Sequence, residues 1–121
     1  MSWRRGRVRA RAVLLLTENG DKVIGPRFVR LLHLIDEQGS LRGAARELGL
    51  GYRHALAWVQ RAEALLERAL VERRAGGAAG GGAVLTPHGR AVIDAYETAA
   101  TEIAGVLARA ERTFFPRRAS D

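Results

Sequence analysis

Cysteine is missing from this sequence, and other residue types that many enzymes rely on are scarce. Without cysteine the chain can form neither disulfides nor thiolate metal sites. Histidine and serine each occur at only three dispersed positions, which makes a nucleophile with a base and an orienting group hard to assemble. We therefore expect a protein that is not an enzyme and that carries no metal and no cofactor.

Long hydrophobic runs are missing as well. No run approaches the roughly 20 apolar residues of a membrane span, and the run at 12–16 is too short for the apolar core of a signal peptide. With 47% hydrophobic and 27% charged residues, the 121-residue chain has the composition of one globular domain. We expect it in the cytoplasm, without a membrane partner.

Acidic residues are outnumbered, 13 against 20 basic ones, and the formal net charge is +7. This balance favours a polyanionic partner such as nucleic acid, although a compositional preference for arginine would also produce it. The placement of the charges favours nucleic acid. Five arginines and no acid lie within residues 1–12, and seven arginines against four acids within residues 40–74; residues 87–115 hold three arginines against four acids.

Two short amphipathic helices joined by a glycine are predicted between residues 40 and 67. Apolar residues recur at i, i+3, i+4 and i+7 from Leu41 to Leu48, and the period returns from Ala55 onward. Ser40 is a good N-cap for the first helix, and Gly49 suits its end because a residue without Cβ enters the left-handed conformation cheaply. The pattern is typical of a helix-turn-helix, whose second helix enters the major groove of DNA. A glycine can also join two ordinary helices of an α-domain.

A wing is predicted directly after these helices, at residues 70–86. Residues 70–74 and 83–85 favour strands, and the glycine-rich segment between them cannot hold a regular element. A phosphate-binding P-loop is rejected, because Ala83 follows where that motif needs lysine and serine or threonine at a helix start. A flexible linker is the other alternative, and the strand-like flanks favour the wing.

The N-terminal segment is predicted to begin as a basic arm and to continue as a strand. Apolar residues alternate with arginines between residues 8 and 16, the period of a half-buried strand. Asn19-Gly20 predicts a hairpin turn, with residues 22–24 as the returning strand. Pro26 then begins a helix that runs to about Gln38 and forms a platform for the helix-turn-helix. His33 lies off the apolar face of that helix, so we expect it to be solvated or to act as a cap.

A long helix is predicted for residues 87–115, with Thr86 as its N-cap and Pro87 at its first position. Apolar residues along it alternate in steps of three and four, which is a heptad seam. Such a seam packs either on its own domain or on a second copy, and the length of the helix favours dimerisation. The seam consists of Ile93, Tyr96, Ala100, Ile103, Leu107, Ala110 and Phe114.

These features together resemble the N-terminal DNA-binding domain of the ModE family of molybdate-responsive transcriptional regulators. The resemblance is carried by GSLRGAARELGLGYRHA at 39–55, by LVERRAGGAAGGGAVLTPHGR at 70–90 and by the long helix that follows. The glycine-rich wing followed by Ala-Val-Leu-Thr is its most specific part, and it covers about residues 10–115. It implies a winged helix-turn-helix that dimerises through N- and C-terminal elements and binds a palindromic operator.

The sequence departs from the family pattern in several places. Gly51 stands where family members usually have a serine that caps the recognition helix, Leu56 stands where tryptophan is common, and Ala79 interrupts the glycines. These departures bear on base preference more than on the fold. The chain also ends before any small OB-like molybdate-binding domain, so oxyanion sensing is not carried over and we expect no molybdate site.

The candidate DNA-binding residues lie on the recognition helix, on the helix before it and at the base of the wing. Arg53 is the first choice for a bidentate contact with guanine. Tyr52 and His54 are either donors to a phosphate or base or packed side chains, and Trp58 is expected in the core. The set is Arg42, Tyr52, Arg53, His54, Arg61, Arg73 and Arg74, with Arg5, Arg7 and Arg9 as an arm that either reaches a groove or forms a solvated tail.

The predicted fold is mainly α with a small β component (α+β): a winged helix-turn-helix with an N-terminal β-hairpin and a long C-terminal dimerisation helix. The division is a basic arm at 1–11, the DNA-binding domain at 12–86 with its helix-turn-helix at 40–67, the dimerisation helix at 87–115 and a tail at 116–121. The predicted function is a homodimeric transcriptional regulator that binds double-stranded DNA. The alternatives are a protein-interaction module on the same fold and a regulator that senses a ligand at its dimer interface.

Overall fold

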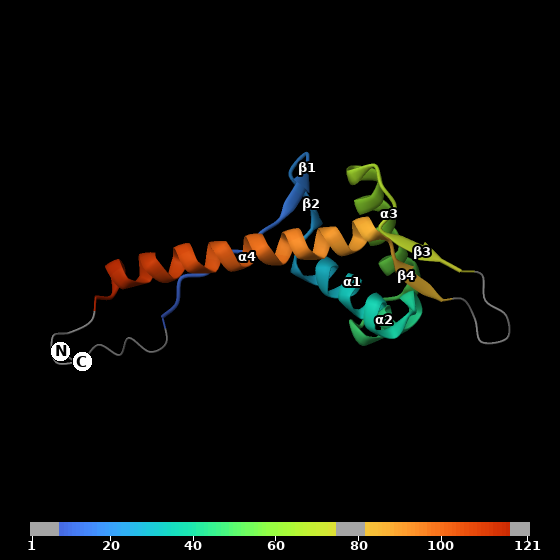
Figure 1. Cartoon of the computed structure of the whole chain (residues 1–121), viewed down its shortest axis with the longest axis horizontal. Helices are drawn as coiled ribbons and strands as arrows, with labels where there is room; N and C mark the ends of the chain where they lie inside the picture. Colours follow the sequence, from blue (N-terminus) through green and yellow to red (C-terminus); the bar gives the residue numbers. More distant parts are fainter. Residues whose placement is uncertain (1–7, 75–81, 117–121) are drawn as a thin grey trace.

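The computed structural model describes residues 8–74 and 82–116. Its architecture confirms the predicted α+β class: a winged helix in which helices predominate and two antiparallel strand pairs are appended (Figure 1). In chain order the elements are β1 (Leu16–Glu18), β2 (Asp21–Ile24), α1 (Pro26–Gln38), α2 (Leu41–Glu47), α3 (Tyr52–Leu66), β3 (Val71–Arg73), β4 (Ala83–Leu85) and α4 (Pro87–Phe114).

Helix α1 is the centre of the core, as the platform prediction requires. It contacts α2, α3, α4, β2 and β4, and its Leu31, Leu32 and Ile35 side chains are completely buried. Burying one such side chain contributes about 1.5–3 kcal/mol. The helix begins at Pro26 and ends before Gly39, whose φ of +67° is left-handed, so both predicted bounds are confirmed.

The predicted helix-turn-helix is present as α2 and α3. The Ser40 hydroxyl accepts a 2.9 Å hydrogen bond from the Gly43 amide and so caps α2. Gly49 has a φ of +71° at the turn, as predicted. Ala44 and Ala55 are almost completely buried, and their small side chains let the two helices approach closely. Helix α3 begins after Gly51 without a side-chain cap.

Both predicted hairpins are confirmed. Asn19 and Gly20, with φ of +52° and +86°, form the turn between β1 and β2. The wing pairs Val71 with Leu85 and Arg73 with Ala83, and its glycine-rich tip at 75–81 lies outside the described residues.

The strand predicted from residue 8 to 16 is wrong, because β1 begins only at Leu16. Residues 8–15 have no regular secondary structure and run alongside α4 (Figure 1). We call this segment the arm. Its backbone bonds to α4 side chains: the Ala10 amide donates to the Glu111 carboxylate, and the Tyr96 hydroxyl donates to the Leu14 carbonyl at 2.8 Å. The alternation is real, but a strand also needs a pairing strand, and the described part of the chain provides none for the arm.

Helix α4 starts inside the globular body and extends well beyond it (Figure 1). Thr86 caps it by accepting from the Gly89 amide at 3.0 Å, as predicted.

In the first half of α4, His33 Nε2 of α1 lies 2.7 Å from Glu97 Oε2 of α4. The His33 side chain is 37% exposed, which agrees with the predicted solvated position, and the packing of α1 on α4 also gives it a carboxylate partner. Over the described residues, no helix is long and apolar enough to cross a membrane.

Candidate nucleic-acid interface

Helix α3 buries one face and leaves the other free. Ala55 and Val59 lie in the core, whereas Arg53, Ala57 and Arg61 are exposed on the opposite side. The major groove of B-DNA, about 12 Å wide, admits a helix with a free face of this kind. We call this side the outward face of α3.

Arg42, Tyr52 and Arg73 come together on the wing side of this face, and we name them the wing-side cluster. The Arg42 guanidinium of α2 lies over the Tyr52 ring of α3, 4.5 Å from its centroid. Arg73 of β3 donates a 3.0 Å hydrogen bond to the Tyr52 hydroxyl oxygen. Tyr52 is half-buried and packs against the core, so one tyrosine positions two arginines from different elements. Both arginines rest on a neutral ring, and their charges stay available to an anion.

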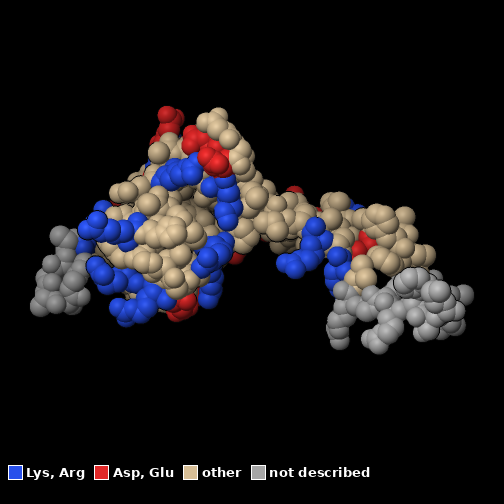
Figure 2. Space-filling view, turned by 180° about the vertical axis from the view of Figure 1, so that it is seen from behind, with Lys and Arg blue, Asp and Glu red and all other residues tan. Residues whose placement is uncertain are grey.

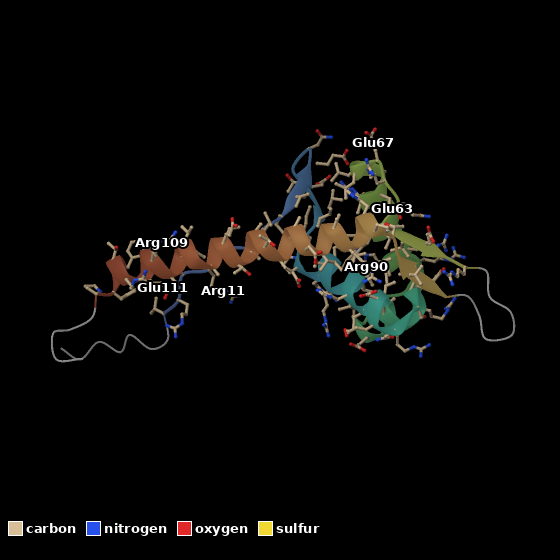
Figure 3. The ribbon with its side chains drawn as sticks, viewed as in Figure 1. Arg11, Glu63, Glu67, Arg90, Arg109 and Glu111 are labelled. Carbon is tan, nitrogen blue, oxygen red and sulfur yellow. The ribbon has the colours of Figure 1, made fainter. Side chains whose placement is uncertain are left out.

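The base of the wing is fixed to α3 by a carboxylate that the sequence did not single out. Glu63 Oε2 accepts from the Leu70 amide at 2.8 Å and from the Val71 amide at 3.2 Å. Figure 3 shows Glu63 beside the start of β3. This contact sets the position of Arg73 relative to the outward face.

On the opposite flank of α3, the first turn of α1 places Arg27, which sequence reasoning also missed. Its Nη2 donates to the Leu48 carbonyl at 2.7 Å, and its guanidinium lies 5.8 Å from the Trp58 ring centroid. Trp58 is half-buried and packs against the core, and its ring centroid lies 5.4 Å from that of His54 in an edge-to-face arrangement. Arg61 lies 3.8 Å from Asp21 in an exposed ion pair. No local sequence pattern predicts that Arg27 lies at this surface, because only the packing of α1 against α3 brings it there.

The remaining candidates on the arm and wing are scattered. Arg74 is exposed, and its backbone amide donates to the Gly82 carbonyl at the base of the wing. Arg9 is exposed on the arm, while Arg5 and Arg7 lie outside the described residues. Figure 2 shows basic side chains spread over the globular body around an uncharged area, with acidic side chains concentrated toward one edge.

The predicted seam residues divide between two environments. Ile93 is buried in the core of its own chain. Tyr96 is half-buried, and burial raises the pKa of its phenol above the usual value. Ala100, Ile103 and Leu107 line an open groove of about 610 Å³ between α4 and the arm. Further along α4, Ala110 is half-buried and Phe114 is 70% exposed.

This surface offers positive charge and hydrogen-bond donors. Among the described residues, no group of three or more His, Cys, Asp or Glu side chains is placed to hold a metal ion. Guanidinium groups bind phosphates and base edges through planar sets of N–H donors. The arrangement is therefore suited to holding a polyanion against α3.

The known proteins that are similar to this chain include bacterial regulators with a helix-turn-helix. The family of bacterial regulatory helix-turn-helix proteins of the lysR type matches residues 26–90. The molybdenum-pterin-binding protein MopB of Rhodobacter capsulatus is 41% identical over 104 residues, which are 86% of this chain and 38% of MopB. The DNA-binding transcriptional dual regulator ModE of Escherichia coli is 40% identical over 72 residues, which are 60% of this chain and 28% of ModE.

A third relative is the molybdenum transport protein ModE of Azotobacter vinelandii, 36% identical over 67% of this chain and 30% of its own length. These relatives confirm the resemblance to ModE that residues 39–55 and 70–90 indicated. The chain spans less than two fifths of the length of each of them.

Proposed function

Because the chain belongs to the bacterial regulatory helix-turn-helix proteins of the lysR family, we propose that it is a transcriptional regulator that binds double-stranded DNA as a homodimer. The observation that carries the proposal is the outward face of α3 with the wing-side cluster at its edge. A cytoplasmic location is part of the proposal, because the protein must reach DNA.

Helix α3 enters the major groove with its N-terminal turns toward the bases. Arg53 contacts a guanine, which contributes about 1–3 kcal/mol of discrimination against other bases. Arg42, Arg73 and Arg74 bind the phosphate backbone, and Tyr52 holds the first two while its own proton is free to donate to a phosphate. His54 and Arg61 extend the contact along α3. Because the arginines of the wing-side cluster rest on a ring and a hydroxyl rather than on carboxylates, binding DNA breaks no ion pair there.

The second copy packs on the outer half of α4. The groove between α4 and the arm is open, and Val13, which lines it, is 57% exposed; at the end of the same helix, Phe114 is 70% exposed. A surface of this kind is unusual on a monomer. The proposed interface is Tyr96, Ala100, Ile103, Leu107, Ala110 and Phe114; Ile93 is left out because its own core already buries it.

A two-fold dimer presents two copies of α3, so the operator is expected to be palindromic. Half-sites one helical turn apart, or a multiple of it, are separated by about 34–36 Å per turn. Molybdenum enters only through the names of the relatives, and the chain spans at most 38% of those named here. The proposal therefore assigns no molybdate role to these residues.

Fluorescence anisotropy with a labelled duplex tests DNA binding. We expect log affinity to fall steeply and linearly with log salt, because released counterions dominate the binding free energy. Arg53→Ala should weaken binding to a selected operator by about 10- to 100-fold, in line with the loss of a bidentate base contact. Arg109→Ala, near the far end of α4 (Figure 3), removes the same charge and should leave affinity unchanged.

Failure to bind any duplex at low salt, with Arg53→Ala indistinguishable from wild type in every assay, would contradict the proposal. That outcome would favour the protein-interaction module, in which the apolar face of α4 binds a different protein.

A further inference from the structure

A basic hollow lies on the flank of α3 that faces away from the wing. It has a volume of about 330 Å³ and is formed where β2, the start of α1 and the middle of α3 meet. Its floor and walls include Phe28, Trp58 and His54, and three cationic side chains line it: Lys22, Arg27 and Arg61. We call it the hairpin-side pocket.

The charge in this pocket is largely uncompensated. Among the described residues that line it, none is acidic. The neighbouring carboxylate, Asp21, approaches Arg61 only to 3.8 Å and is itself 78% exposed, so it screens little of the positive charge. An anion entering the pocket would meet cations from three different elements.

Arg27 is held in place by neutral groups. Its Nη2 is bonded to the Leu48 carbonyl in the helix-turn-helix turn, and its plane lies near the Trp58 ring. A guanidinium carries five N–H donors, so one bond to a carbonyl leaves others free for an oxyanion. The indole and the carbonyl thus restrict the side chain without neutralising it, which lowers the entropy cost of binding.

The pocket is placed at the second edge of the proposed DNA surface. Tyr52 and Trp58 are six positions apart on α3, which puts them on opposite sides of the outward face at about 100° per residue. Tyr52 belongs to the wing-side cluster and Trp58 to the pocket. When α3 lies in a major groove, the wing-side cluster and the pocket therefore face the two phosphate backbones that border the groove.

We propose that the hairpin-side pocket binds one backbone phosphate of DNA, at the groove edge opposite the wing. The proposal rests on the proposed function, since the phosphate belongs to the duplex that α3 enters. Lys22 and Arg27 neutralise the phosphate, and Arg61 reaches it from α3. Such a contact positions the helix without reading sequence. Arg27 also donates to the Leu48 carbonyl, so it links the phosphate contact to the turn that orients α3.

The test compares charge-removing variants on two duplexes: a sequence that wild type selects from a random pool, and an unrelated one. Lys22→Gln with Arg27→Gln should raise Kd by about tenfold on both duplexes and reduce the log–log salt slope by about one, as expected for one lost phosphate contact. Arg109→Gln is the matched control, and it should change neither quantity. Lys22→Gln alone, on an exposed hairpin position, tests the pocket if the double variant is unstable.

Neutral methylphosphonate linkages, placed one at a time in the selected duplex, then locate the contact. At one position outside the wing-side contacts, the substitution should weaken wild type and leave the double variant unaffected. An unchanged salt slope in the variants, with wild type and Arg53→Ala behaving as proposed above, would overturn the pocket while the DNA-binding function stands. Loss of all duplex binding by wild type would instead refute the function itself. A third outcome is that inorganic phosphate stabilises wild type but not the double variant, while DNA binding is the same in both. The pocket would then bind a free oxyanion, which also overturns the proposal.

Discussion

The globular body and the outer half of α4 contain similar proportions of apolar residues. The body buries their large side chains, whereas the outer half of α4 exposes several of them. In the body, from β2 to Ile93, the large apolar side chains of α1 are 5% exposed or less. Beyond Ile93 the described apolar side chains reach exposures of 53% at Val106 and 70% at Phe114. The body is complete as a single chain, whereas the outer half of α4 has apolar surface that a second chain would cover. Substitutions matched between the two regions test this contrast.

The largest effect is expected on the outer half of α4. Leu107→Asp places a charge in the groove beside the arm, where the second copy is proposed to pack. The 13.2 kDa chain should then sediment as a monomer at concentrations where wild type has twice that mass. Affinity for a palindromic duplex should fall by about a hundredfold, because the two α3 helices no longer act together.

The control for that substitution is Thr101→Asp, which adds the same charge at an exposed polar position of the same helix. It should leave the mass and the affinity of wild type intact. A Leu107→Asp protein that remains a dimer, with its far-ultraviolet spectrum unchanged, would show that the groove is not the interface.

An intermediate effect of opposite sign in the two regions is expected from the same Gly→Ala change. At Gly89 a Cβ would collide with the Leu70 carbonyl, because α4 begins directly against the end of the α3–β3 connection. Gly89→Ala should lower the free energy of unfolding by about 1–3 kcal/mol, as overpacking does. At Gly105, in the outer half of α4, the nearest atom is the flexible end of Arg109 at 3.8 Å.

Gly105→Ala should therefore raise stability by about 0.5–1 kcal/mol through helix propensity alone. Urea denaturation of both variants measures the difference. If both change stability in the same direction, the claim that the body is tightly packed where α4 enters it is wrong.

The smallest effect is expected at the start of α3. Gly51 has an ordinary φ of −67°, and a Cβ there would meet nothing within 4 Å. Gly51→Ser supplies the missing N-cap and should raise the free energy of unfolding by a few tenths of a kcal/mol. Thermal melting, compared with Gly51→Ala, separates the cap from the loss of glycine entropy; equal gains from both would exclude a capping contribution.

The elements of the body were predictable because their signals are local. Ser40, Gly49 and Thr86 mark helix ends through their own backbone and hydroxyl geometry, and Asn19-Gly20 specifies a hairpin turn wherever it is placed. The two wing strands are also short-range features. These positions agree between sequence and structure within one or two residues.

What the sequence missed depends on contacts between distant segments. His33 finds Glu97, Arg27 finds Trp58 and Glu63 finds the start of β3 only after the helices pack. The alternation before Leu16 predicted a strand wrongly because a pattern of side chains says nothing about whether a pairing strand is present. The heptad pattern likewise assigned Ile93 to the dimer seam, although Ile93 is buried in the core of its own chain. The sequence does not show whether an apolar residue is covered by its own core or by a second copy.

In the function proposed above, two copies of α3 bind one symmetric DNA site. Selection of duplexes from a random pool by the purified chain, followed by sedimentation of the protein on the enriched duplex, tests it most directly. We predict enrichment of an inverted repeat that carries guanines within each half-site, with two chains bound per duplex. Enrichment of a site without two-fold symmetry by a single chain, or no enrichment at low salt, would contradict it.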